Sequence, residues 1–500
     1  MTVNAVTSRC GPRATQTASK NPSRIPRGRH SILFSAEPSM RRGGIAMPSN
    51  HISLVHGWLP VAIQAVAGIT LSLAAGWRSW RWRLLWLPSA AVLGVTTAVG
   101  AHRCIITRAP QALFVWIALA GMAIAILLLG WRGARWWRRG LSILAVPLCL
   151  LCSLLVLNQW VGYFQTVQSA WSQFTSGPLP DQTDRATVTT LAARGAKPPH
   201  GSLVPVQIPE DASHFKHREE LVYLPPAWFA SYPPPQLPTV LMIGGMVNTP
   251  ADWVRAGNAV DTVDAFAAAH GGNSPVLVFA DPGGALDNDT ECVNGSRGNA
   301  ADHLTKDVVP YMISTFGVSK DPSRWGIVGW SMGGTCSVDL TVMHPALFSA
   351  FVDIDGDLTP NTGTREQTIA DLFDGSADAW ATFDPATVIA RHGRYTGVSG
   401  WFAISSTGSP SPRRDVDSTA MAVAGRAAAD PGDQAAAAAS LCALGRANGI
   451  DCAVVAQGGH HDWPTAGTAF ATALPWLAGQ LGTPGASRIS LPGNASRQAL

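Results

Sequence analysis

The chain has 500 residues, enough for two or three domains, and a formal net charge of +4. Charged residues make up only 14% of it, well below the roughly 25% that is usual in soluble domains. This deficit argues against a wholly soluble protein. The sequence also has no basic patch with interleaved aromatic residues, so we expect no nucleic-acid partner.

The first 46 residues form a basic segment rich in Ser, Pro and Arg, a composition typical of disorder. The segment has no apolar run of the kind that a signal peptide needs. We therefore expect residues 1–46 to be disordered, and we expect translation to begin near Met47.

Four apolar stretches then predict a transmembrane region over residues 47–165. Each approaches or exceeds the roughly 20 residues that cross a bilayer core, and Trp residues cluster at their ends, as interfacial residues do. The second stretch is the weakest, because Pro88 lies inside it. The stretches are Ile52–Trp77, Leu84–Gly100, Gln111–Trp131 and Leu141–Phe164.

The arginines in the short loops predict the orientation of these stretches. Most of them lie in the first and third loops, which places those loops in the cytoplasm and everything after the fourth stretch outside. We therefore expect a multi-pass protein of the cell membrane with an extracytoplasmic C-terminal domain. The first loop holds Arg78, Arg81 and Arg83, the third holds Arg132, Arg135, Arg138 and Arg139, and the second holds only Arg103 and Arg108.

The remaining chain divides into a polar linker (166–199), an α/β domain (200–482) and a loose tail (483–500). Strands that alternate with helices predict a mainly parallel sheet. Ser202–Ile208 and Glu220–Leu224 are typical of opening strands. Asn299 is expected to cap a helix that runs to Phe316, with a kink at Pro310.

The most informative motif is Gly329-Trp330-Ser331-Met332-Gly333, a G-x-S-x-G sequence. An apolar run, Trp325 to Val328, precedes it, and a helix-like segment, Thr335 to Met343, follows it. In this context a sharp strand-to-helix turn lifts the serine hydroxyl clear of the backbone. Such a turn holds its serine in a sparsely populated conformation, which costs roughly 1–3 kcal/mol. Ser331 is therefore the predicted nucleophile.

Two histidines after the last predicted strand, Cys452 to Ala456, compete for the role of general base. We expect His461 to be the base, with His460 as the second choice. The acid that orients the base should follow the strand Trp401 to Ser405. Asp417 is the first choice and Asp433 the second, among four candidates that also include Asp415 and Asp430.

An oxyanion hole needs two backbone N–H groups aimed at the reacting carbonyl. One is expected from Met332, directly after the nucleophile. The other is expected from Met246, in the Gly-rich turn after the strand Val240 to Ile243.

Residues 237–481 resemble the esterase family that contains S-formylglutathione hydrolase and the antigen 85 mycolyltransferases. The ordered landmarks are the oxyanion turn at Ile243–Met246, the serine turn at Gly329–Gly334, and His461-Asp462-Trp463. The resemblance implies the α/β-hydrolase fold, and it favours His461 because the catalytic His of that family stands two residues before an aromatic residue. The membrane-tethered architecture is also similar to that of actinobacterial hydrolases of aminoacyl-phosphatidylglycerol.

These features predict a membrane-anchored serine esterase that hydrolyses an ester, of a cell-envelope lipid or a small molecule, through an acyl-enzyme on Ser331. The alternatives are an acyl (mycolyl) transferase of the antigen 85 type and a non-catalytic envelope binding protein of the same fold.

We expect no cofactor and no metal. Asp353 to Asp357 imitates a calcium loop, but Leu358 and Thr364 stand where such a loop needs Gly and Glu. Four cysteines of the α/β domain could form disulfides, with three possible connectivities. They are Cys292, Cys336, Cys442 and Cys452, and Cys442–Cys452 is the local pairing.

Overall fold

A computed structural model describes residues 52–76, 79–104, 110–131, 135–164, 166–167, 170, 179–196, 198–406 and 433–493. The expected start near Met47 and the segment 1–46 therefore lie outside the described residues. The same holds for Asp415, Asp417 and Asp430.

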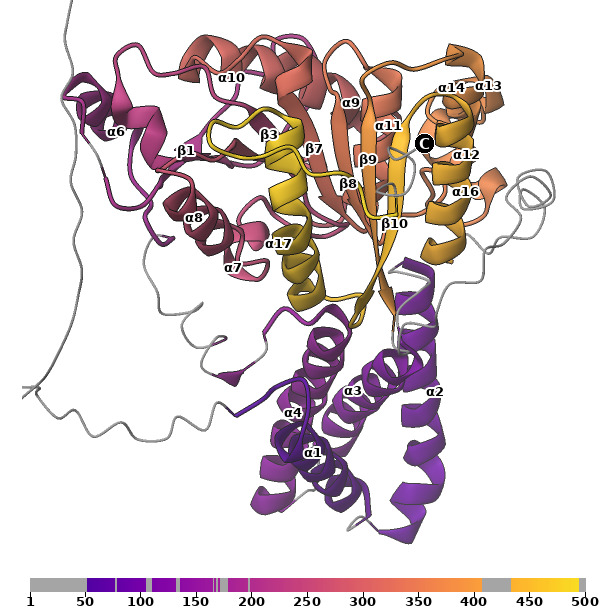
Figure 1. Cartoon of the computed structure of the whole chain (residues 1–500). Helices are drawn as coiled ribbons and strands as arrows, with labels where there is room; N and C mark the ends of the chain where they lie inside the picture. Colours follow the sequence, from indigo (N-terminus) through magenta and orange to yellow (C-terminus); the bar gives the residue numbers. More distant parts are fainter. Residues whose placement is uncertain are drawn as a thin grey trace, which may run out of the picture. The chain divides into compact units, whose positions relative to one another are not determined.

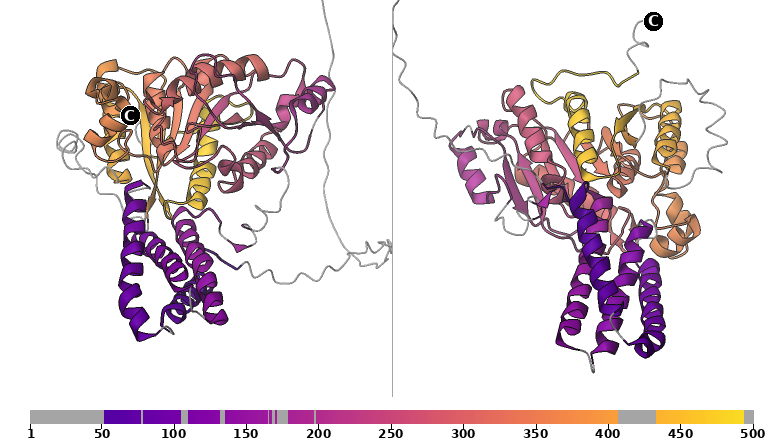
Figure 2. Two further views of the ribbon diagram at one scale, coloured as in Figure 1. Left: turned by 180° about the vertical axis from the view of Figure 1, so that it is seen from behind. Right: turned by 90° about the horizontal axis from the view of Figure 1, so that it is seen from below.

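The four apolar stretches are helices, as expected, and each is long and apolar enough to cross a membrane. Pro88 lies within the second helix and does not end it, and Pro147 lies within the fourth. Helices α1 and α4 pack together, α4 packs on α3, and α3 packs on α2, so the four lie side by side (Figure 2). They are α1 (Trp58–Gly76), α2 (Trp80–Cys104), α3 (Gln111–Gly130) and α4 (Trp136–Val161).

The rest of the chain is built on an eight-stranded sheet with the order β1-β2-β4-β3-β7-β8-β9-β10 (Figure 1). Strands β1 and β2 are antiparallel to their neighbours, and the other strands run parallel to one another. The strands are β1 (Ser202–Val206), β2 (Glu220–Leu224), β3 (Thr239–Ile243), β4 (Val276–Ala280), β7 (Trp325–Trp330), β8 (Ala350–Ile354), β9 (Ser399–Ser406) and β10 (Asp451–Gly458); β5 (Asn294–Gly295) and β6 (Gly298–Asn299) form a separate hairpin. The expected mainly parallel α/β fold is confirmed.

Alternate residues of each strand point to opposite sides of the sheet. Helices cover both sides, so each face has its own apolar core. In β3, Leu241 and Ile243 belong to the core shared with helices α10 and α11, whereas Val240 and Met242 belong to the core under α8 and α17. Figure 1 shows these two layers of helices. The helices are α6 (Arg185–Ala193), α7 (Asp252–Arg255), α8 (Ala259–Ala269), α9 (Ala300–Asp302), α10 (Val309–Phe316), α11 (Met332–Met343), α12 (Arg365–Phe373), α13 (Ala377–Ala381), α14 (Pro385–His392), α16 (Gln434–Ala447) and α17 (Trp463–Gln480), with 3₁₀ turns η1 (Pro226–Ala230) and η3 (Pro322–Arg324).

The predicted helix from Asn299 to Phe316 is interrupted. One π-helical segment, η2 (His303–Val308), separates α9 from α10, and Pro310 follows it as the second residue of α10. The predicted side-chain cap is wrong: the Asn299 amide donates to the Ser213 carbonyl oxygen at 2.9 Å instead.

The structure also differs from the expected linker and tail. Helix α6 lies inside the segment 166–199, and its Val188 and Ala192 are buried in the main core. Leu491 is buried as well, so the chain still packs on the domain well beyond residue 482. In both places a few apolar residues in a polar segment formed too weak a pattern to indicate burial.

A buried polar network joins the start of the sheet to the π-helical segment. The His303 ring contacts the Glu220 carboxylate at 3.1 Å and the Asp307 carboxylate at 3.4 Å. Burial pushes the pKa of His303 down, but the hydrogen bonds and charges of Glu220 and Asp307 outweigh burial and raise it above its ordinary value. The folded protein therefore favours protonated His303.

This network makes stability depend on pH. A group whose pKa is raised by folding stabilises the fold while it is protonated, so its contribution disappears as the pH rises through the raised pKa. We expect the thermal midpoint of the purified full chain to fall as the pH rises through that pKa, and we expect the Glu220→Gln variant to show a flatter slope over the same pH range. Unfolding curves over a pH series measure both.

Lys306→Gln is the control, because it breaks only the more exposed ion pair with Asp302. An unchanged slope in Glu220→Gln would show that the network does not couple protonation of His303 to folding.

Candidate active site

Ser331 lies at a tight turn between β7 and α11. Its φ of 57° and ψ of −121° form a strained conformation that non-glycine residues rarely adopt, and its N–H donates to the Ile354 carbonyl oxygen at 2.8 Å. Close packing explains the flanking glycines: a Cβ on Gly333 would collide with the carbonyl oxygens of Ile243 and Gly244. The turn can form only where neighbouring backbones approach this closely.

His461 is the histidine that the structure brings to Ser331. Its Nε2 lies 3.0 Å from the Ser331 Oγ, whereas the adjacent His460 is exposed. The loop that carries both residues follows β10 and is fixed at its end, because the Asp462 carboxylate accepts from the Thr465 N–H at 3.0 Å and begins α17. The serine and its expected base thus lie within hydrogen-bond reach.

Aromatic residues hold the His461 ring from one side. The Trp330 ring lies 5.3 Å from it, centroid to centroid, and the Trp463 ring lies 4.4 Å from Trp330. Trp463 is fully buried and also packs edge-to-face on Trp253. This stack restricts the His461 ring on one side. The His461 side chain is still 38% exposed.

The carboxylate beside the base is Asp355, which was not among the four predicted candidates. Its Oδ2 lies 3.6 Å from the His461 Nδ1, while its Oδ1 accepts from the Ser405 N–H at 2.7 Å. Asp355 is buried, so few other groups compete for its charge. Catalytic hydrogen bonds are often long in free enzymes and shorten when substrate binds.

The two predicted acids stand differently. Asp417 lies outside the described residues, so its role stays a prediction. The Asp433 side chain caps α16 by accepting from the Ala436 N–H at 3.0 Å. The signal that could have found Asp355 is its place directly after β8, since β8 is the neighbour of β7 and parallel strands end at the same edge.

The acidic run around Asp355 also contains a buried carboxyl group with a raised pKa. Burial, helped by the charges of Asp355 and Asp357, raises the pKa of Asp353 to about 8. Its Oδ1 accepts from the Gly356 N–H at 2.7 Å, and a Cβ on Gly334 would collide with the same oxygen. Asp353 therefore supports the serine turn from behind.

The expected oxyanion donors lie on two elements that meet at Ser331. Met332 is the first residue of α11, where N–H groups have no partner within the helix. The loop after β3 passes directly beside the serine, because a Cβ on Gly245 would lie 3.2 Å from the Ser331 Cβ. Met246 is the next residue in this loop, and its role as the second donor stays a prediction.

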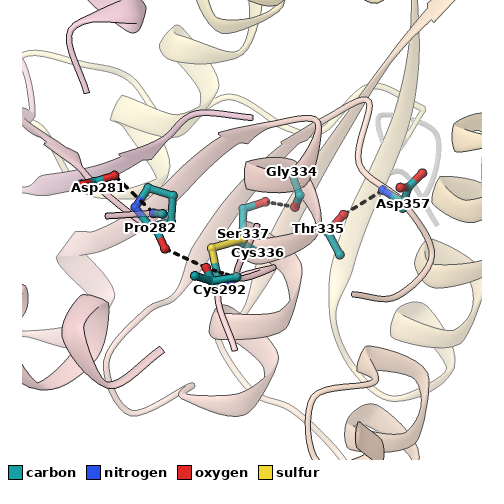
Figure 3. Close-up of a disulfide and its surroundings, with 10 residues drawn as sticks. Asp281, Pro282, Cys292, Gly334, Thr335, Cys336, Ser337 and Asp357 are labelled. Atoms are coloured by element: carbon teal, nitrogen blue, oxygen red, sulfur yellow. Dashed lines mark hydrogen bonds between the residues drawn. A yellow bond between two sulfur atoms is a disulfide. The ribbon is translucent and has the colours of Figure 1, made fainter. Parts of the chain in front are cut away.

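Two disulfides form in the α/β domain, Cys292–Cys336 and Cys442–Cys452. Cys336 lies on α11, so the first disulfide ties the loop after β4 to the helix that begins at the serine turn (Figure 3). On the same helix, the Thr335 hydroxyl accepts from the Asp357 N–H at 2.9 Å. The start of α11 is thus linked to the loops after both β4 and β8.

Within the described residues, His217, Glu220 and His303 have potential metal-ligand atoms within 4.8 Å of one another. However, both ring nitrogens of His217 lie 2.8 Å from backbone carbonyl oxygens, those of Arg218 and Ile208. Both ring nitrogens are therefore already next to backbone hydrogen-bond acceptors, which leaves neither of them free to face a metal ion. The cluster fits a hydrogen-bond network better than a metal site.

Comparison with known proteins identifies the family. Residues 216–477, more than half of the chain, match the family model Esterase, described as "Putative esterase". The chain belongs to this esterase family. The expected resemblance to an esterase family is confirmed.

A Corynebacterium glutamicum protein described as uncharacterized is 33% identical to this esterase over 216 residues, which are 41% of this chain. The chain spans about half the length of that curated relative.

Solved structures of similar fold include an S-formylglutathione hydrolase from Agrobacterium tumefaciens (16% identity, TM-score 0.43, 57% of this chain and 96% of that one). Others are a ferulic acid esterase (16%, 0.42, 57% and 99%) and MPT51 of Mycobacterium tuberculosis (17%, 0.36, 55% and 99%).

The geometry predicts which carboxylate supports the base. In Asp355→Asn the side-chain oxygen can still accept from Ser405, but the amide then faces His461 and favours the wrong tautomer. Ester turnover should fall by up to about 10⁴-fold, as when an acid of this kind is replaced by its amide. Turnover per labelled active site is the measurement.

Asp433→Asn is the matched control, because Asn caps helices as well as Asp does. It should retain turnover. Loss of turnover in Asp417→Asn, with Asp355→Asn unaffected, would instead place the acid in the segment after β9.

Proposed function

We propose that the protein is a membrane-anchored serine esterase that cleaves an ester of a cell-envelope lipid. The observation that carries the proposal is the 3.0 Å contact between the Ser331 Oγ and the His461 Nε2 at the strained turn after β7. A serine is a useful nucleophile only when such a base lies beside it.

The first half of the reaction acylates Ser331. As its oxygen attacks the ester carbonyl carbon, the His461 Nε2 takes the hydroxyl proton, and the Asp355 carboxylate stabilises the resulting imidazolium through Nδ1. The Met246 and Met332 amides donate to the negative oxygen of the tetrahedral intermediate. The intermediate collapses, the ester bond breaks, and His461 delivers its proton to the leaving alcohol.

The second half of the reaction releases the acyl group. A water molecule loses a proton to His461 as its oxygen attacks the acyl carbon, and collapse of the second intermediate returns the proton to Ser331. The products are a free acid and the regenerated serine. If an alcohol took the place of water, the product would be a new ester and the protein would be a transferase.

The four apolar helices support a lipid substrate. Each is long enough to cross a bilayer core, so they would keep the hydrolase domain close to the membrane surface. Confinement of this kind raises the effective concentration of a lipid ester at the site without any new contact.

The two disulfides support the expected extracytoplasmic orientation, because stable disulfides are rare in the reducing cytosol. We expect protease added to intact spheroplasts to digest a C-terminally tagged domain. A cytosolic marker protein, cleaved only after lysis, is the control. Protection of the tag until lysis would place the domain in the cytoplasm and contradict the arginine pattern of the loops.

The substrate is testable by comparing the wild type with Ser331→Ala in membranes. The lipid panel includes aminoacyl-phosphatidylglycerol and trehalose mycolates, and a fluorophosphonate probe reports a reactive serine. We expect the wild type to consume one lipid, release free acid and react with the probe, and we expect Ser331→Ala to do none of these.

Ser337→Ala is the matched control. Ser337 lies on the same helix, and its hydroxyl is committed to the carbonyl oxygens of Gly334 and Val352. It should label like the wild type. A new ester as product would indicate a transferase, and a wild type that neither reacts with the probe nor consumes any lipid would indicate a binding protein.

A further inference from the structure

We propose that Arg218 is a positioning residue that holds the oxyanion loop, residues 244–248, against Ser331. The inference rests on the proposed function, in which the Met246 amide stabilises the oxyanion. Arg218 lies two residues before β2 and far along the chain from the serine, and nothing in its sequence context indicates a role at the site.

The Arg218 guanidinium contacts the loop and a buried carboxylate at the same time. Its Nη2 donates to the Asn248 carbonyl oxygen at 2.8 Å and to the Asp281 Oδ1 at 2.6 Å, and its Nε donates to the Asp281 Oδ2 at 3.0 Å. The planar guanidinium fixes the angle between these donors. The position of Asn248 therefore follows that of Asp281.

Asp281 is itself firmly placed. It directly follows β4 and is fully buried, and its carboxylate also accepts from the Arg218 N–H at 2.6 Å and from the Gly283 and Gly284 N–H groups. Although burial pushes the pKa of Asp281 up, the hydrogen bonds and charge of Arg218 hold it below its ordinary value. Asp281 thus stays ionised and keeps Arg218 in one orientation.

The loop needs this support because its own conformation is strained. Val247, the residue between Met246 and Asn248, has a φ of 62°, which is unfavourable for a β-branched side chain. Within the loop, the Asn248 N–H donates to the Gly245 carbonyl oxygen at 3.2 Å, and the Asn248 amide lies 3.4 Å from Asp252. These contacts are longer than those that Arg218 makes, so loss of Arg218 should let the loop relax.

The direct test is Arg218→Lys in the full-length membrane protein, assayed on a short soluble ester. A lysine keeps the charge beside Asp281, but one ammonium group cannot reproduce the fork that also reaches Asn248. We expect kcat to fall about 10- to 100-fold with little change in KM, because loss of a whole oxyanion donor lowers turnover by about 10²–10³. A boronic acid that forms a tetrahedral adduct on Ser331 should lose affinity in parallel with kcat.

Asp307→Asn is the matched control for a merely structural effect. Asp307 belongs to the buried network around His303. Its partners are the His303 ring and the Ala212 and Ser213 N–H groups, none of which belongs to the oxyanion loop. It should lower the thermal midpoint without lowering kcat. If Arg218→Lys does not fold, Asp281→Asn weakens the same support and should show the same loss of kcat.

Two outcomes would overturn the inference: a folded Arg218→Lys with the kcat and boronic acid affinity of the wild type, or an equal loss of kcat in Asp307→Asn. Failure of the proposed function is recognised separately, because Ser331→Ala would then hydrolyse the ester as fast as the wild type.

Discussion

The close approach of three backbones around Ser331 is the constraint on which the rest of the site depends. The chain after β3 passes so close to Gly333 that the carbonyl oxygens of Ile243 and Gly244 occupy the space of a Cβ, so the turn fits only with glycine there. That approach brings the oxyanion loop to the serine. On the other side, the Ser331 N–H donates to the Ile354 carbonyl oxygen, which brings the end of β8 to the same place.

The order of the strands then determines which loops reach the serine. Strand β7 lies between β3 and β8, so the loops after those two strands border Ser331 directly. The loop after β3 supplies the expected oxyanion donor, and the loop after β8 supplies Asp355. His461 comes from the loop after β10, the edge strand, and reaches the serine from further away along the same edge of the sheet.

Charges around the site are arranged in two groups with different roles. Behind the serine turn, Asp353 is buried with its pKa raised to about 8, and it supports the backbone by accepting from the Gly356 N–H. At the start of the sheet, the ion pair of Arg218 and Asp281 stays charged, because a buried carboxylate that lost its partner would be strongly destabilising. The first group stiffens the serine turn, and the second stiffens the oxyanion loop.

Local patterns in the sequence were enough to predict most of the elements. Short apolar runs and glycines marked β2, β3, β7 and α11, and long apolar runs marked α1 to α4, because burial and turn geometry leave periodic signals within a few residues. The same reasoning singled out Ser331 as the expected nucleophile, whereas the preference for His461 over His460 came from the resemblance to the esterase family. It did not find α6 as part of the core or the π-helical segment, where the deciding contacts come from residues distant in the sequence.

What only the tertiary structure decided is the set of partners that meet from separate elements. Asp355 stands beside His461 because β8 neighbours β7, and no spacing along the chain encodes which strands are neighbours. Cys292 pairs with Cys336, and Arg218 reaches Asn248, for the same reason. The sequence by itself indicated the serine turn and the pair of histidines as candidates, since residue types and a strand-turn-helix pattern can be read locally. The residues that hold these candidates in place come from distant segments, and their contacts exist only once the sheet has formed.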